Sequence, residues 1–96
     1  MYCMIRSTRG KRAENAVRGI YGKGFPSDLI RRTNAMLTAM DAAAALEDLR
    51  FPPGNRLERL RGDLNGQHSV RINDQWRICF VWTAQGPADV EIVDYH

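Results

Sequence analysis

Three groups that can transfer protons come together at the end of the chain. Asp94 supplies a carboxylate, Tyr95 a phenol and His96 an imidazole. Histidine is the one whose ordinary pKa, about 6.5, suits acid–base chemistry near neutral pH. The end of a chain is also a common place for polar residues that have no role. These residues are therefore candidates for proton transfer, and a polar end without function is the alternative.

An arginine interrupts the most apolar segment in the second half of the chain. Around it, large apolar side chains recur with a period of two: Trp76, Ile78, Phe80 and Trp82. A strand with this pattern would place Arg77 on the opposite face. A charged side chain in mid-strand is expected where that face is wet or binds an anion. Arg77 is thus a candidate phosphate ligand, and a plain solvent-facing arginine is the alternative.

A second group of charged residues surrounds a glycine-rich loop at residues 62–66. Glu58, Arg59 and Arg61 precede the loop, and Arg71 follows it on the next predicted strand. Glu58, Arg59 and Arg61 could present one carboxylate and two cations to a single groove, with Arg71 nearby. An exposed hairpin with weak ion pairs explains the same residues at least as well.

The other residues with reactive or stacking side chains fit structural roles. His68 has no acid or nucleophile beside it, and Trp76 and Trp82 belong to a core by their spacing. Cys3 and Cys79 lie far apart without ligands at metal-binding spacing, which argues against a zinc site and gives no disulfide framework. We therefore expect no metal and no cofactor.

The length and composition indicate one folded domain over residues 1–96. Apolar residues make up 44% of the chain and charged residues 26%, the ordinary balance of a globular protein. No run of about 18 apolar residues is present to span a membrane. The segment from Met1 to Arg12 turns basic without the apolar core of a signal peptide. We expect a reduced, cytoplasmic protein.

Arginine dominates the charge of the chain. The formal net charge is +3, and 12 of the 14 basic residues are arginine, whose planar guanidinium can grip phosphate oxygens with two parallel hydrogen bonds. Basic blocks at residues 1–32 and 50–77 alternate with acidic blocks at 33–49 and 78–96. Folding could separate these blocks into a basic groove and an acidic rim, although scattered solvated charge is the simpler alternative.

Helical periodicity dominates the first half of the chain. After a short possible strand at residues 4–7, apolar residues at helical spacing predict a helix over residues 13–21, which glycines end. Pro26 and Asp28 supply the start signals of a second helix over residues 29–40. The alanine run continues as helix to Leu49, with a possible break near Asp41, until the Pro-Pro-Gly segment ends it.

The second half changes to the period of two that is typical of strands. We predict a short strand or bend near Arg59, a strand over residues 67–72, a tight turn at 73–75 and a strand from Trp76. A further turn at residues 85–87 leads to Val90 and Ile92, which can join the same core. The expected fold is α+β, with two or three N-terminal helices on one face of an antiparallel sheet.

These residues together resemble the HigB-type toxins of the RelE/ParE superfamily. Residues 60–80, LRGDLNGQHSVRINDQWRICF, look like the pattern L-K/R-G-D-x-x-G-x-x-S-I-x-x-N-x-x-W-R-I-x-F of those toxins, and the chain closes with their D-Y-H. Residues 46–50, LEDLR, and 52–58, PPGNRLE, also look like one branch of the family. The resemblance implies a RelE-like fold whose concave face binds messenger RNA in the ribosomal decoding site.

The chemistry that the resemblance implies is cleavage of RNA without a metal. The ribose 2′-hydroxyl attacks the adjacent phosphate, so the enzyme needs a base, cations for the phosphorane and an acid for the leaving oxygen. Arg77 matches the arginine that family members use against the scissile phosphate, and Arg61 falls where many have lysine. His96 and Asp94 are candidates for proton transfer and Tyr95 for positioning.

The resemblance leaves one position and several functions open. Glu58 stands where some relatives carry a histidine, which makes the assignment of base and acid uncertain. A gyrase poison of the ParE type and a non-catalytic nucleic-acid-binding module are the alternative functions. Family members are encoded beside an antitoxin with a helix-turn-helix domain, so the resemblance implies that partner, and through it operator DNA, in addition to the ribosome and messenger RNA.

Overall fold

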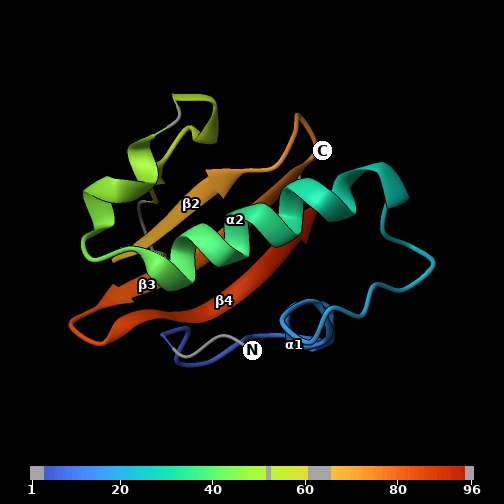
Figure 1. Cartoon of the computed structure of the whole chain (residues 1–96), viewed down its shortest axis with the longest axis horizontal. Helices are drawn as coiled ribbons and strands as arrows, with labels where there is room; N and C mark the ends of the chain where they lie inside the picture. The colour runs from blue at the N-terminus through green and yellow to red at the C-terminus, as the bar shows by residue number, and fades with distance from the viewer. Residues whose placement is uncertain (1–3, 52, 61–65, 95–96) are drawn as a thin grey trace.

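Four strands form an antiparallel sheet in the order β1-β2-β3-β4 within residues 4–51, 53–60 and 66–94, the part of the chain that this computed structural model describes. Figure 1 shows the sheet behind a long helix. The strands are β1 (Glu58–Arg59), β2 (Gln67–Arg71), β3 (Trp76–Thr83) and β4 (Gly86–Asp94). Each strand pairs antiparallel with the next one along the chain.

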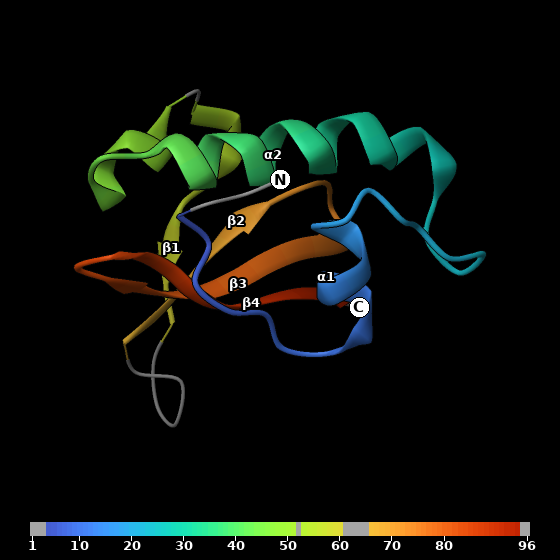
Figure 2. The ribbon, with the colours of Figure 1, turned by 60° about the horizontal axis from the view of Figure 1, so that its bottom comes forward.

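The helices lie on one side of this sheet. α2 (Ile30–Ala42) crosses its face, and α1 (Lys11–Ala16) lies beside β4, as Figure 2 shows. The described residues also form three short 3₁₀ helices. η1 (Ser27–Leu29) directly precedes α2, and η2 (Leu46–Arg50) and η3 (Pro53–Asn55) lie between α2 and β1. Within the described residues, no helix has the length and apolar character that crossing a membrane requires. The predicted α+β fold with helices on one face is confirmed.

The core fills the space between α2 and the sheet. The buried positions of α2 follow helical spacing: Thr33, Met36, Leu37 and Met40. They meet the face of the sheet that carries Val70, Ile78, Phe80, Val90 and Ile92, all of them buried. Complete burial of one such side chain contributes about 1.5–3 kcal/mol, so these contacts fix which face of the sheet turns toward α2.

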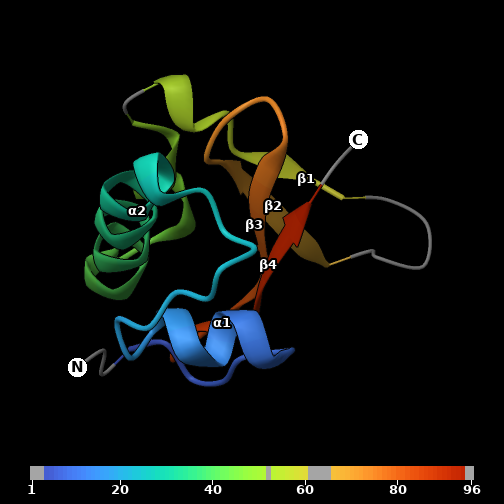
Figure 3. The same cartoon turned by 90° about the vertical axis from the view of Figure 1, so that its right-hand side faces the viewer.

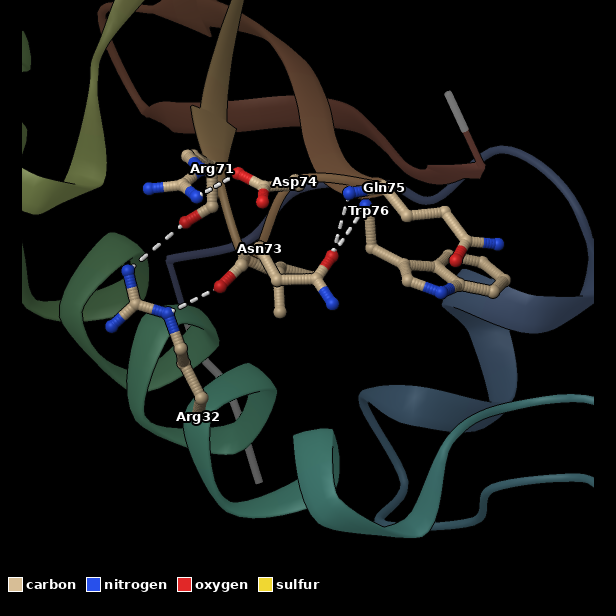
Figure 4. A network of polar contacts seen from close by, with 7 residues as sticks. Arg32, Arg71, Asn73, Asp74, Gln75 and Trp76 are labelled. Atoms are coloured by element: carbon tan, nitrogen blue, oxygen red, sulfur yellow. Dashed lines mark hydrogen bonds and ion pairs between the residues drawn. The ribbon is translucent and has the colours of Figure 1, made fainter. Parts of the chain in front are cut away.

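Arg32 binds the end of β2 to the helix, and Asn73 shapes the turn that follows. The Arg32 guanidinium donates from Nε to the Ile72 carbonyl at 2.6 Å and from Nη2 to the Arg71 carbonyl at 3.2 Å. The Asn73 Oδ1 accepts the backbone N–H groups of Gln75, at 2.9 Å, and Trp76, at 2.7 Å. Figure 4 shows both sets of bonds. The asparagine side chain thereby closes the predicted β2–β3 turn.

The first expected strand is replaced by a looser pairing with β4. Residues 4–7 form no strand; Thr8 makes an isolated parallel bridge to Val90, and the Arg6 N–H donates to the Pro87 carbonyl. The Asp41 carboxylate accepts the N–H groups of Met4, at 2.7 Å, and Ile5, at 3.0 Å. A side chain of α2 therefore takes the donors that a strand would have used.

Both predicted helices are shorter than the apolar periodicity indicated. α1 ends at Ala16 and not at Tyr21, before Gly19, whose φ of 79° suits a glycine. α2 ends at Ala42, and Ala43 is extended. The Asp48 carboxylate accepts the N–H groups of Ala44, at 3.0 Å, and Ala45, at 3.1 Å, so the expected continuation to Leu49 becomes a separate 3₁₀ helix.

Candidate active site on the open face of the sheet

The sheet face opposite α2 carries three of the five predicted charged site residues that the structure describes. Figure 3 shows α2 on one side of the sheet, and no described helix on the other. Cross-strand partners in an antiparallel sheet share a face, so the strand register defines two rows of side chains there. One row runs across all four strands, and the next lies beside it: Glu58, Ser69, Cys79 and Glu91, then Arg71, Arg77 and Val93. We call these seven residues the open face.

Arg77 is held at the centre of the open face by three contacts. Its Nε donates to the Ser69 hydroxyl oxygen at 2.9 Å, and its Nη2 donates to the Arg56 carbonyl, also at 2.9 Å. The Glu58 carboxylate lies 3.6 Å from the same Nη2. The Arg77 side chain is 13% exposed and Glu58 is 58% exposed. The guanidinium is therefore fixed in position, and a small part of the side chain remains exposed.

The Arg56 carbonyl, which accepts the hydrogen bond from Arg77, lies in a turn with an unusual backbone. Arg56 has a φ of 46°, a conformation that residues other than glycine seldom adopt. The buried Asn55 stabilises the turn by donating from Nδ2 to the carbonyls of Leu49, at 3.2 Å, and Phe51, at 3.1 Å. The Arg56 N–H also donates to the Pro53 carbonyl at 3.1 Å. Together these bonds hold the Arg56 carbonyl in place before β1.

Arg71 lies directly opposite Arg77 on the neighbouring strand. Its guanidinium contacts the carboxylate of Asp74 in the β2–β3 turn, a bond visible in Figure 4. The Arg71 backbone is fixed as well, because Arg32 binds its carbonyl. The structure thus brings together three of the predicted site residues, Arg77, Arg71 and Glu58, on one face of the sheet.

Two other predicted residues point to the face that packs on α2. Arg59 pairs with His68, whose ring stacks on Phe80 with 6.0 Å between centroids. Burial of the imidazole, and secondarily the nearby Arg59 charge, lowers the pKa of His68. Asp94 pairs with Trp76 and accepts a bond of 3.0 Å from the Gln75 side-chain amide. Strand alternation therefore separates Arg59 and Asp94 from Arg77.

The other predicted site residues cannot be placed on either face. Arg61, Tyr95 and His96 lie outside the described residues. The arrangement around Arg77 can therefore be judged by itself. It offers a fixed cation and an adjacent exposed carboxylate, which are the groups that a phosphate and a mobile proton need.

Four residues that contact or support the predicted site residues were not singled out from the sequence. Ser69 binds Arg77 directly, and Asn55 supports it through the Arg56 turn. Asp74 binds Arg71, and Gln75 binds Asp94. Ser69 stands at the serine of the family pattern, and a spacing of three residues joins Arg71 to Asp74. Those two signals were present in the sequence, whereas Asn55 and Gln75 act through contacts that only the fold creates.

Comparison with known proteins connects this geometry to one family. Residues 19–96 match the model of a family described as the RelE-like toxin of the type II toxin-antitoxin system HigB. Toxin HigB-1 of Vibrio cholerae is 47% identical over 58 residues, covering 60% of this chain and 61% of that protein. An uncharacterized protein of Haemophilus influenzae is 36% identical over 56 residues, covering 58% of this chain and 55% of that protein. The aligned part spans about three fifths of the length of these curated relatives.

Proposed function

The chain belongs to the RelE-like toxins of type II toxin–antitoxin HigB systems, and from this premise we propose that it is a ribosome-dependent endoribonuclease that cleaves translated messenger RNA. The observation that carries the proposal is the fixed guanidinium of Arg77 on the open face. A preorganised cation costs no reorganisation when negative charge develops on a phosphate. A gyrase poison that acts by binding alone has no need of such a group.

The proposed reaction uses the RNA itself as the nucleophile. The ribose 2′-oxygen forms a bond to the adjacent phosphorus while the bond from phosphorus to the 5′-oxygen breaks. A base on the protein takes the 2′-hydroxyl proton, and an acid returns a proton to the leaving 5′-oxygen. The products are a 2′,3′-cyclic phosphate and a 5′-hydroxyl, with no metal and no cofactor required.

Arg77 supplies the charge that stabilises the phosphorane in this scheme. Its bonds to Ser69 and Arg56 use Nε and Nη2, which leaves Nη1 without a partner among the described residues. Glu58, 3.6 Å from Nη2, is the carboxylate best placed to accept a proton beside that phosphate. Asp94, Tyr95 and His96 enter the scheme through the family resemblance, with His96 as the leading candidate for the acid. Asp94 enters it on that ground alone, since its pairing with Trp76 directs it to the other face from Arg77.

Cationic residues around the site are proposed to hold the RNA strand. Arg71 is directly opposite Arg77 and adds a second guanidinium on the same face. Arg61 is included on the family pattern, in which the equivalent position is basic. Arg59 stands one position beyond Glu58 at the edge of the sheet, where a strand passing around that edge would meet it.

The proposed protein partner is an antitoxin with a helix-turn-helix domain encoded beside this chain. Such an antitoxin would neutralise the toxin and bring it to operator DNA without a direct contact between this chain and the DNA. Co-expression of the two genes with a tag on this chain alone tests the partnership. Recovery of the neighbouring gene product at a fixed ratio supports it, and recovery of the tagged chain alone contradicts it.

Inducible expression in a bacterial host tests the nuclease. Wild type, Arg77→Ala and a variant lacking His96 are induced, and the 5′ ends of messenger RNA are mapped. We expect cuts within translated codons for the wild type and their loss in both variants. Arg18→Ala is the matched control, because Arg18 is an exposed arginine beyond the end of α1, paired with Glu14 at 3.8 Å. It should cut as the wild type does.

Other outcomes separate the remaining functions. If growth stops without such cuts and DNA damage appears, the gyrase-poison mechanism replaces the nuclease. If growth arrest survives both Arg77→Ala and loss of His96 but fails when many arginines are neutralised together, the chain acts as a binding module.

A further inference from the structure

The open face places two like charges directly opposite each other. Arg71 on β2 and Arg77 on β3 are cross-strand partners, an arrangement that destabilises a sheet when nothing relieves the repulsion. Each guanidinium has a carboxylate as its internal partner: Asp74 for Arg71 and Glu58 for Arg77. The chain therefore keeps a pair of opposed cations and supplies two anions to neutralise them.

The cations are held more firmly than the anions. The side chains of Arg77 and Arg71 are 13% and 29% exposed, whereas those of Glu58 and Asp74 are 58% and 96% exposed. Arg77 has two further hydrogen bonds, and Arg32 fixes the backbone of Arg71. The carboxylates thus contact the cations from the solvent side, from which a ligand would also arrive.

Displacing these carboxylates requires little free energy. Exposed ion pairs contribute only about 0.2–1 kcal/mol each. A phosphate group offers a guanidinium several oxygens and can bind with two parallel bonds, so it competes well with a single carboxylate oxygen. An incoming nucleic-acid strand can therefore take over both cations without disturbing their supports.

We propose that Arg71 and Arg77 form a seat for two neighbouring phosphates of one RNA strand, and that Asp74 and Glu58 occupy this seat until the RNA displaces them. The inference rests on the proposed function, because it concerns the same RNA. It adds that Asp74, which takes no part in the cleavage scheme, sets the affinity for RNA by competing with a phosphate for Arg71.

Removal of the competing charge tests the seat directly. The probe is a single-stranded RNA with 2′-O-methyl riboses, which binds but lacks the attacking hydroxyl, and binding is followed by fluorescence anisotropy. Asp74→Asn is expected to bind this RNA about 1.5–5-fold more tightly than the wild type, the range that corresponds to the free energy of one exposed ion pair. In the wild type the displaced Asp74 carboxylate takes up a cation when RNA binds and offsets part of the counterion release. The slope of log affinity against log salt should therefore be steeper in Asp74→Asn, by up to about 0.7, the value for one phosphate on a single strand.

Two controls separate the seat from a general change in charge. Glu47→Gln removes one negative charge at an exposed position on η2, outside the open face, and should leave the affinity nearly unchanged. Arg71→Ala should weaken binding, and Asp74→Asn added to it should then give no gain. Urea unfolding of each variant shows whether the fold is intact.

Each outcome decides the proposal. Equal gains for Asp74→Asn and Glu47→Gln, or a gain that survives Arg71→Ala, would overturn the seat and leave the nuclease untouched. The seat is also overturned if the wild type cuts messenger RNA in cells while the purified chain holds no RNA. Failure of both cutting and binding in the wild type overturns the proposed function and the seat together.

Discussion

The two faces of the sheet are built from the same strands but hold different kinds of side chain. The face under α2, which we call the covered face, is apolar, with Val70, Ile78 and Phe80 fully buried. The open face carries Arg71 and Arg77, each bound to a carboxylate or a hydroxyl of the chain. Alternate residues of β2 and β3 therefore serve stability on one side and chemistry on the other.

This division depends on strand register. A slip by one residue would turn Arg77 into the core and Ile78 toward the solvent. The Asn73 side chain opposes such a slip, because it accepts the N–H groups of Gln75 and Trp76 and so fixes where β3 begins. The position of the candidate site thus follows from the packing of the core, and variants on the two faces should fail in different ways.

The largest expected effect is a loss of stability on the covered face. Phe80→Ala removes a fully buried ring beneath α2 and should lower the free energy of unfolding by about 3–5 kcal/mol. Urea denaturation followed by circular dichroism measures it. Val93→Ala is the matched truncation on the open face, where the half-buried side chain should lose about 1 kcal/mol or less. Equal losses would contradict the division between the faces.

The second effect should appear in catalysis and not in folding. Arg77→Lys keeps the charge but loses the planar fork that binds Ser69 and Arg56 together, so the cation is misplaced. We expect cleavage of ribosome-bound messenger RNA to slow on the order of 10²-fold. Single-turnover rates measure the change, and urea unfolding should stay within about 1 kcal/mol of the wild type. A fully active lysine variant would remove Arg77 from the proposed chemistry.

The covered face was easier to predict from the sequence than the open one. Apolar spacing gave α2 and the buried residues of β3 and β4, because burial imposes the helical and strand periods directly. Alternation also placed Arg77 on the face opposite the core. The same alternation places Cys79 on that face, yet Cys79 is buried there, because a period of two shows which side a residue takes and not what covers it.

The partners of the site residues could not be predicted in the same way. Glu58 and Arg77 are 19 positions apart in the sequence, and their ion pair arises only when β1 is added beside β2. The bond from Arg77 to the Arg56 carbonyl depends on a φ of 46° at Arg56, which no pattern in the sequence predicts. Arg59 was grouped with Arg61 and Arg71 by charge, yet the register with His68 directs it to the other face.

A smaller effect should appear where the two layers are joined. Arg32→Ala removes two hydrogen bonds from a charged group to the carbonyls of Ile72 and Arg71, and should lower the free energy of unfolding by about 1.5–3 kcal/mol. Hydrogen exchange should also rise in the β2–β3 turn, because its support on α2 is gone. The neighbouring exposed residue provides the control, and Arg31→Ala should change neither measurement appreciably.

The smallest effect should be a pH dependence that belongs to the covered face. Burial first, and the Arg59 charge second, lower the pKa of His68 from its ordinary value of 6.5, so the folded chain favours the neutral imidazole. Below pH 6.5 the unfolded chain binds more protons at this residue than the folded chain does, until both forms are protonated. The stabilisation by His68 is therefore complete above pH 6.5 and is lost as the pH falls toward the lowered pKa.

Comparison with His68→Gln isolates this contribution. The free energy of unfolding of both proteins is measured in urea at a series of pH values from about 5 to 8. The difference between the two removes the contribution of every other group that the substitution leaves unchanged. The stability of the wild type relative to the variant should rise with pH through this range and level off above 6.5. Because Arg59 adds to the shift, Arg59→Gln should reduce the rise. A difference that falls with increasing pH would mean that the imidazole is protonated in the fold, and that burial beside Phe80 does not favour its neutral form.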